Sequence, residues 1–186
     1  MILVGFDEAG RGPLAGPVAA AAVILPIGFP VELLNDSKKL SEKKRLAAEA
    51  VIKEKALWGL AFVDHKKIDE INILRASLLA MKLAFEDLLK KNVGIDLNDL
   101  SGIADGTFVP QVQIKCQAVV KADAKFPEVM AASILAKTAR DRFMVEMDKK
   151  YPGYGYAKHK GYPTAAHKAA CRELGPSPIQ RLSFTY

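Results

Sequence analysis

The segment from Val4 to Pro17, VGFDEAGRGPLAGP, constrains the fold and the chemistry of this chain more than any other. Residues 1–6 form an apolar run, which predicts a short buried strand. The run is followed by two adjacent carboxylates, Asp7 and Glu8, and by a glycine-rich turn that carries one arginine. Two acids that lose water together repel each other, and a divalent cation is the common compensation because it prefers hard oxygen ligands. The segment therefore predicts a metal site.

The rest of the chain alternates short apolar runs with helical patterns. A first strand followed closely by a second predicts a hairpin-like start, and later crossovers add parallel strands. The length of 186 residues suits one domain with a sizeable core, so we expect residues 1–186 to form a single α/β domain. The patterns predict strands over 1–6, 18–25, 57–63, 100–104 and 112–120, and helices over 41–56, 68–91, 128–149 and 164–174.

Acidic residues follow two of the later predicted strands. Asp105 comes directly after the strand over 100–104, and Asp123 comes shortly after the strand over 112–120. One acid at a strand end is usually a turn former. Three such positions, one of them the Asp7-Glu8 doublet, favour convergence, because open α/β sheets place their sites at the carboxyl ends of strands.

Positive charge is concentrated in the second half of the chain. Residues 1–100 carry 14 basic and 14 acidic residues, whereas residues 101–186 carry 13 and 7, which accounts for the whole net charge of +6. A basic cluster alone is as well explained by a solvated helix face. Together with a carboxylate metal site, it favours a surface that binds a phosphate backbone.

The glycine turn also has two nucleotide-binding interpretations. Residues 10–15 match G-x-G-x-x-A, and residues 5–10 match the start of a phosphate loop. The first match is weak because Pro17 falls inside the required helix and residues 18–25 have strand character. The second lacks the Lys-Ser/Thr pair that holds phosphate and Mg²⁺. A carboxylate-metal nuclease site explains more of the residues.

The two cysteines bear on the cellular compartment. Cys116 and Cys171 are far apart in sequence and lack metal-ligand spacing, so we interpret them as buried thiols in a reducing compartment. No secretory signal is visible, and no apolar stretch reaches the ~18–20 residues of a membrane span. We expect a cytoplasmic monomer that does not bind membranes.

Several motifs, in order along almost the entire chain, resemble ribonuclease HII, the type 2 ribonuclease H. The opening motif and the Ser-Ile-Leu-Ala-Lys block are the most specific of them. The matching segments are Asp7–Pro17, Asp36–Leu40, Lys121–Asp123, Ala131–Lys137, Arg140–Asp141, His159–Thr164 and Pro178–Phe184.

This resemblance implies a ribonuclease H-like fold, with a mixed five-stranded sheet flanked by helices and a helical, substrate-binding C-terminal region over about 150–186. It implies an endoribonuclease that cleaves the RNA strand of RNA–DNA hybrids and nicks 5′ of single ribonucleotides in duplex DNA. The products implied are 5′-phosphate and 3′-hydroxyl ends. The family's four metal-binding acids map onto Asp7, Glu8, Asp105 and Asp123, which would hold two Mg²⁺ or Mn²⁺ ions.

The resemblance also implies how the substrate is recognised. In the family, the backbone of Gly10-Arg11-Gly12 and the tyrosine at Tyr162 read the 2′-hydroxyl at an RNA–DNA junction. Lys137 and Arg140 lie three residues apart on one predicted helix face, which suits phosphate contacts. Further candidate contacts are Ser37, Lys38, Ser133, Lys158 and Lys160.

The sequence departs from the family pattern at two places and leaves several questions open. Gln180 stands where bacterial members commonly have histidine, and Asp105-Gly-Thr107 replaces a commoner Asp-Gly-Asn. The alternatives are another nuclease or resolvase of the ribonuclease H-like fold, and a non-catalytic module that binds hybrids. A sliding clamp is a further candidate partner. The sequence does not distinguish the metal used or the preferred substrate length.

Overall fold

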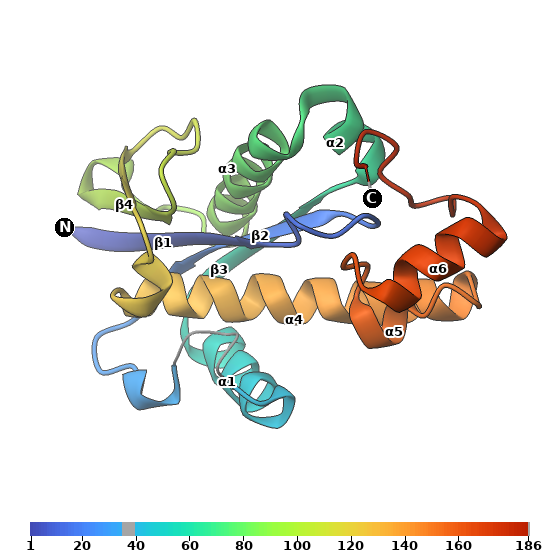
Figure 1. Cartoon of the computed structure of the whole chain (residues 1–186). Coiled ribbons are helices and arrows are strands. Elements are labelled where there is room, and N and C mark those ends of the chain that lie inside the picture. Colours follow the sequence, from blue (N-terminus) through green and yellow to red (C-terminus); the bar gives the residue numbers. More distant parts are fainter. Residues whose placement is uncertain (35–39, 186) are drawn as a thin grey trace.

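The computed structural model describes residues 1–34 and 40–185, and its centre is a mixed five-stranded sheet (Figure 1). The strand order is β3-β2-β1-β4-β5. β2 pairs antiparallel with β1 and β3, whereas β4 pairs parallel with β1 and β5. This topology confirms the predicted hairpin-like start and parallel crossovers. The strands are β1 (Ile2–Ala9), β2 (Val18–Ile24), β3 (Leu57–Val63), β4 (Leu100–Asp105) and β5 (Lys115–Val119).

Helices cover both faces of the sheet. Helix α3 (Ile73–Lys91) packs on β3 and β2, and α4 (Pro127–Lys150) packs on β1 and β2 from the other side. Figure 1 shows α1 (Glu42–Lys55) outside α4, and the two C-terminal helices beside the end of α4. Within the described residues, no helix is both long and apolar enough to cross a membrane. The remaining elements are α2 (His65–Ile71), α5 (Tyr156–His159), α6 (Ala165–Leu174) and the 3₁₀ turns η1 (Val31–Leu33), η2 (Leu97–Asp99) and η3 (Ala122–Ala124).

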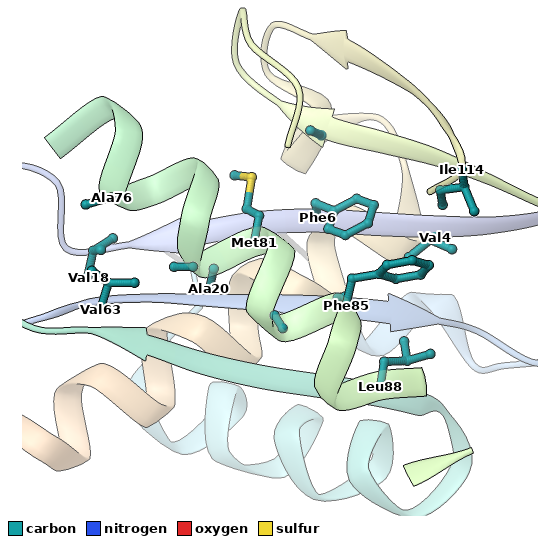
Figure 2. Packing of buried hydrophobic residues seen from close by; sticks show 14 of the residues in the cluster. Val4, Phe6, Val18, Ala20, Val63, Ala76, Met81, Phe85, Leu88 and Ile114 are labelled. Carbon is teal, nitrogen blue, oxygen red and sulfur yellow. The ribbon is translucent and has the colours of Figure 1, made fainter. Parts of the chain in front are cut away.

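Strand β1 lies at the middle of the core and is packed differently on its two faces. On the α3 face, Val4 and Phe6 are fully buried, and the Phe6 and Phe85 rings meet edge to face at 5.7 Å (Figure 2). On the α4 face, a Cβ added at Gly5 would lie 2.2 Å from the carbonyl carbon of Glu128. Only glycine allows this approach, so the α4 backbone crosses directly over β1.

Two predicted element boundaries are wrong. The single helix predicted over 68–91 is two helices, because Asn72 adopts a left-handed φ of 68° and its side chain accepts a hydrogen bond from the Arg75 amide. Asparagine is among the best helix N-caps, so Asn72 begins a new helix here. The strand predicted over 112–120 is shorter, and β5 covers only 115–119. The predicted cap of the last helix is confirmed, since Thr164 Oγ1 accepts from the His167 amide.

Candidate active site

The acidic doublet lies inside β1, at the first two positions after its ladder with the parallel strand β4. The β1–β4 ladder ends at the pair Phe6↔Ala104, whereas the β1–β2 ladder continues to Ala9↔Ala19. Asp7 and Glu8 are therefore paired on one side only. The prediction that the strand ends at residue 6 is wrong, because antiparallel pairing with the alanine-rich β2 carries it to Ala9. The early end of β4 opens the sheet beside both carboxylates.

Strand geometry sends the two carboxylates to opposite faces of the sheet. Asp7 lies on the α4 side, is only 5% exposed, and accepts hydrogen bonds from its neighbour's amide and from Ser133 of α4. Burial, and then the charges of Glu8 and Asp105, raise the pKa of Asp7 well above its usual range. Burial also raises the pKa of Glu8, although the Arg11 guanidinium, 3.4 Å from Glu8 Oε1, opposes this rise.

These carboxylates open into one pocket with a volume of about 300 Å³. Asp105, the last residue of β4, contributes a third carboxylate to its wall. The wall thus unites residues from β1, the glycine turn, β4, α4 and the loop after α5. The lining residues are Asp7, Glu8, Ala9, Gly10, Arg11, Gly12, Asp105, Ser133, Lys137 and Tyr162.

Asp123, the fourth predicted acid, is not among the residues that line the pocket. Asp123 belongs to η3 and is 8% exposed. The amide of its neighbour Ala122 donates to Asp105 Oδ1 at 2.7 Å, which fixes η3 against the end of β4. Among residues 1–34 and 40–185, no three His, Cys, Asp or Glu side chains are grouped as a ready metal site. Three of the four acids line one pocket, and the hydrogen bond from Ala122 to Asp105 brings the segment that carries Asp123 to the end of β4.

The donor chemistry of this site fits a hard divalent cation. Its acidic ligands are carboxylates alone, drawn from β1 and β4, and the raised pKa values of Asp7 and Glu8 reflect mutual repulsion and lost hydration. A divalent cation would favour their ionised forms, and oxygen ligands of this kind suit Mg²⁺ or Mn²⁺. The thiols of Cys116 and Cys171 are not part of the pocket wall.

Arg140 does not occupy the position predicted for it. We expected a phosphate contact beside Lys137, but the Arg140 side chain is only 1% exposed. Its guanidinium donates to three backbone carbonyls, those of Ala15, Pro17 and Lys160, at 2.8–3.1 Å. Burial lowers its pKa to about 10. Arg140 thus ties the glycine turn to the loop that carries Tyr162.

A second buried arginine supports the same turn, and sequence reasoning gave it no role. Arg181 is fully buried, and its guanidinium donates to the carbonyls of Gly10, Arg11, Gly16 and Pro17 at 2.6–3.1 Å. Burial, and then the charge of Arg140, lower its pKa to about 9. These hydrogen bonds hold the turn at the pocket wall. The only signal in the sequence for a role of Arg181 was its place in the C-terminal motif. Its residue type gave none, because a basic residue in a terminal segment usually lies at the surface.

Tyr162 and the glycine turn lie against each other at the pocket. A Cβ added at Gly12 would lie 3.6 Å from Tyr162 Cε1, so this ring packs over the glycine. Gly10 has φ +101°, and a Cβ there would lie 2.0 Å from Arg140 Nε, so both its conformation and its neighbour require glycine. Tyr162 is 39% exposed, which leaves part of its ring open to a substrate.

The remaining predicted contacts are distributed unevenly. Lys137 lines the pocket, and its Nζ lies 2.6 Å from Asp141 Oδ1. Lys158 is exposed, whereas the Nζ of the half-buried Lys160 is occupied by the carbonyl of Ala157. Ser37 and Lys38 lie outside the described residues. The dinucleotide interpretation is wrong, because residues 18–24 form β2 where that fingerprint needs a helix.

Sequence comparison places these residues in a known family. A family model described as ribonuclease HII matches residues 4–186. The ribonuclease HII of Dechloromonas aromatica is 51% identical over 184 residues, which cover 98% of this chain and 90% of the relative. The ribonuclease HII of Treponema denticola is 52% identical, and the match covers 98% of each chain.

Solved structures agree with the fold. The structure of the PCNA:RNase HII complex from Archaeoglobus fulgidus matches with a TM-score of 0.79 and 23% identity, over 100% of this chain and 96% of that one. Bst-RNase HIII in complex with Mn²⁺ matches with a TM-score of 0.76 and 17% identity, over 100% and 67%. At these identities the two structures show the fold alone. Because the family match spans nearly the whole chain and the sequence relatives share half of its residues, this chain belongs to the ribonuclease HII family and is a ribonuclease H enzyme.

Proposed function

We propose that this protein uses Mg²⁺ or Mn²⁺ to cleave the RNA strand of RNA–DNA hybrids and to nick 5′ of ribonucleotides embedded in duplex DNA. The products would carry 5′-phosphate and 3′-hydroxyl ends. One observation carries the proposal: a single pocket holds the carboxylates of Asp7, Glu8 and Asp105 together with Gly10–Gly12 and Tyr162. The first group suits metal ions at a phosphate, and the second suits recognition of a sugar.

Asp7, Glu8, Asp105 and Asp123 are the residues that would hold two divalent ions. When bound, such ions supply Lewis acidity, which activates water and stabilises charge on the scissile phosphate and the leaving oxygen. The protein's part is to orient the ligands. Ser133 and the Glu8 amide fix the Asp7 carboxylate, and Arg11 restrains Glu8. The Mn²⁺ complex of the ribonuclease HIII neighbour supports a divalent ion here.

Substrate recognition would come from the opposite wall of the pocket. The 2′-hydroxyl is the group that distinguishes a ribonucleotide within DNA. Arg140 and Arg181 hold the turn through its carbonyls, and the amides of Gly10, Arg11 and Gly12 would contact the sugar hydroxyl together with the Tyr162 hydroxyl. Lys137 would contact a phosphate. The charge excess in residues 101–186 favours a polyanionic duplex.

The assay uses a DNA duplex with one embedded ribonucleotide, a full RNA–DNA hybrid and an all-DNA control, each with and without Mg²⁺ or Mn²⁺. We expect metal-dependent cleavage of the first two only. Equal cutting of the all-DNA control would instead favour another nuclease or resolvase of the same fold. Full function in Asp105→Asn and Asp123→Asn would favour a module that only binds hybrids, because binding alone needs no metal ligands.

Tyr162→Phe is expected to weaken junction preference more than general cleavage. The variant keeps the ring that packs on Gly12 but lacks the hydroxyl, so about a fivefold to tenfold loss is expected for the single-ribonucleotide duplex. Cleavage of a long hybrid should fall less, because the enzyme can bind a long hybrid at many positions along the RNA strand. The measurement is kcat/KM on both substrates. An equal loss on both would count against a role in reading the junction.

Two further features remain proposals. The solved complex of PCNA with an RNase HII supports a sliding clamp as a partner, but that contact belongs to the archaeal protein. Both cysteines are free thiols in the structure, which suits the reducing cytoplasm that we propose as the location.

A further inference from the structure

Two histidine rings are stacked beneath the loop that carries Tyr162. His159 ends α5 and His167 lies on α6, and their ring centroids are 4.5 Å apart with planes inclined by 17°. The Tyr156 ring packs edge-on against both, at 5.9 Å and 5.5 Å. Figure 1 shows these two helices side by side at the end of α4. The stacked pair therefore holds the two ends of the loop of residues 159–167 together.

The hydrogen bonds of the pair fix the backbone on both sides of Tyr162. His159 Nδ1 accepts from the Gly161 amide at 3.1 Å, and its Nε2 lies 2.7 Å from the Tyr154 carbonyl. His167 Nδ1 lies 3.0 Å from the Tyr162 carbonyl. Since carbonyl oxygens only accept, His159 must carry its proton on Nε2 and His167 on Nδ1. In this network the His159 imidazole is neutral, because its Nδ1 must stay unprotonated to accept.

The surroundings of the pair disfavour a positive charge. His167 is fully buried and its Nε2 has no hydrogen-bond partner in the structure. Burial, and to a lesser extent His159, lower the pKa of His167. The titratable or charged groups around the pair come from α5 and its flanking loops, α6 and α4. Tyr156 packs against both rings, Tyr154 stacks on Tyr156, Cys171 lies near Tyr156, and Arg140 of α4 donates to the carbonyl of Lys160 in the loop.

We propose that His159 and His167 are positioning residues that hold Tyr162 against Gly12, and that protonation of His167 releases it. A proton on His167 Nε2 would be buried, and this atom has no hydrogen-bond partner among the described residues. The expected change in substrate choice rests on the proposed function of Tyr162. The expected movement of Tyr162 does not depend on that function.

The expected pH dependence has a definite sign. The unfolded chain binds a proton at His167 near the ordinary pKa of about 6.5, whereas the folded protein resists it. Where the unfolded state binds more protons, stability falls as the pH falls. This loss begins near pH 6.5 and grows until the folded pKa is reached. Junction preference, the ratio of kcat/KM on the single-ribonucleotide duplex to that on the hybrid, should decline at lower pH, around the lowered pKa of His167, where the folded protein itself takes up the proton.

Two substitutions of His167 separate the bond to Tyr162 from the titration. An asparagine amide can occupy the place of Nδ1 and still donate to the Tyr162 carbonyl, but it does not titrate. A glutamine amide extends to the place of Nε2 and loses that bond. We expect His167→Asn to keep junction preference and make it independent of pH, and His167→Gln to lower it about fivefold to tenfold at all pH values. His65→Asn, at the third histidine, is the matched control.

NMR spectra of the metal-free protein test the position of Tyr162 without any substrate. The Gly161 and Tyr162 amide signals should shift in His167→Gln, and in the wild type below pH 6.5, but stay in place in His167→Asn and His65→Asn. Melting temperatures measured alongside identify any variant that is only destabilised. Unmoved amides in His167→Gln, or equal amide shifts on acidification of His167→Asn, would overturn the positioning role.

Kinetics then test the link to substrate choice. In a double-mutant cycle, His167→Gln should add little to the loss of junction preference caused by Tyr162→Phe, because both act through one side chain. Additive losses would overturn the coupling. If Tyr162→Phe itself leaves the preference unchanged while the amides move as expected, the proposed function of Tyr162 fails and the positioning role stands.

Discussion

Asp7→Asn is expected to abolish cleavage and, at the same time, to stabilise the metal-free protein. Asp7 is a buried carboxylate whose ionised form is disfavoured by burial and by the charges of Glu8 and Asp105. An amide of the same shape removes that cost and should raise the free energy of unfolding by roughly 1–2 kcal/mol. The same amide is a poor metal ligand, so kcat/KM should fall by roughly a thousandfold or more. Denaturant unfolding without metal and cleavage with Mg²⁺ measure the two effects.

Asp87→Asn is the matched control for this substitution. Asp87 lies on α3, where it accepts from the Leu60 amide at 2.9 Å and from Lys91 Nζ at 2.6 Å. Its carboxylate is stabilised by these partners, so its replacement should cost stability and leave cleavage unchanged. The two substitutions should thus change stability in opposite directions, and only Asp7→Asn should lose cleavage. A destabilised Asp7→Asn, or one that cleaves within about tenfold of the wild type, would remove Asp7 from the metal site.

The pH dependence of the metal-free protein provides a second test of Asp7. A carboxyl whose pKa is raised on folding binds its proton at a higher pH in the native state than in the unfolded chain. The native protein then binds more protons, and this group's contribution to stability improves as the pH falls from neutral towards the ordinary value of about 3.9. Asp7→Asn should remove this contribution, so the advantage of the variant shrinks on acidification. Urea unfolding at several pH values measures it.

Sequence patterns predicted the sheet well because its strands differ in composition from the helices. The apolar runs of β1, β2 and β3 are short and bounded by turn signals, and the crossover lengths dictate parallel addition of β4 and β5. The end of β1 was not predictable from residues 1–8 alone, because it depends on pairing with β2. The break at Asn72 was missed because the apolar pattern continues through it on both sides.

At the site, sequence reasoning identified the chemical groups better than their surroundings. Asp7, Glu8, Asp105 and Tyr162 do line one pocket. Arg140, however, was assigned to phosphate because it lies three residues from Lys137 on one predicted helix face, and no local pattern reveals that three distant carbonyls surround it. Asp123 was expected beside the other acids; it is absent from the pocket wall, but its η3 turn is bound to the end of β4 by the hydrogen bond from the Ala122 amide to Asp105.

Replacement of Arg181 is expected to produce the largest loss of stability of any substitution considered for this protein. Its guanidinium donates to four carbonyls of the glycine turn, three of them in buried residues, and its side chain is fully buried. Arg181→Met would leave those carbonyls without their donors, at a cost of about 3–5 kcal/mol in the free energy of unfolding. Arg181→Lys keeps the charge but not the planar fork, so it should recover only part of this loss. Guanidinium chloride unfolding measures both.

Arg142→Lys separates this effect from the loss of an arginine in general. Arg142 lies on α4 and pairs with Glu49 at 2.9 Å, but its side chain is 54% exposed, so its replacement should have little effect on stability. Arg181→Lys, assayed at a temperature where it stays folded, should also cleave more slowly than Arg142→Lys. Arg181 binds the carbonyls of Gly10 and Arg11, and the nearby Glu8 is a proposed metal ligand. A displaced turn would therefore disturb both the metal site and the residues proposed to contact the ribose. A stable Arg181→Met enzyme with normal kcat/KM would show that the turn keeps its shape without the buried cation.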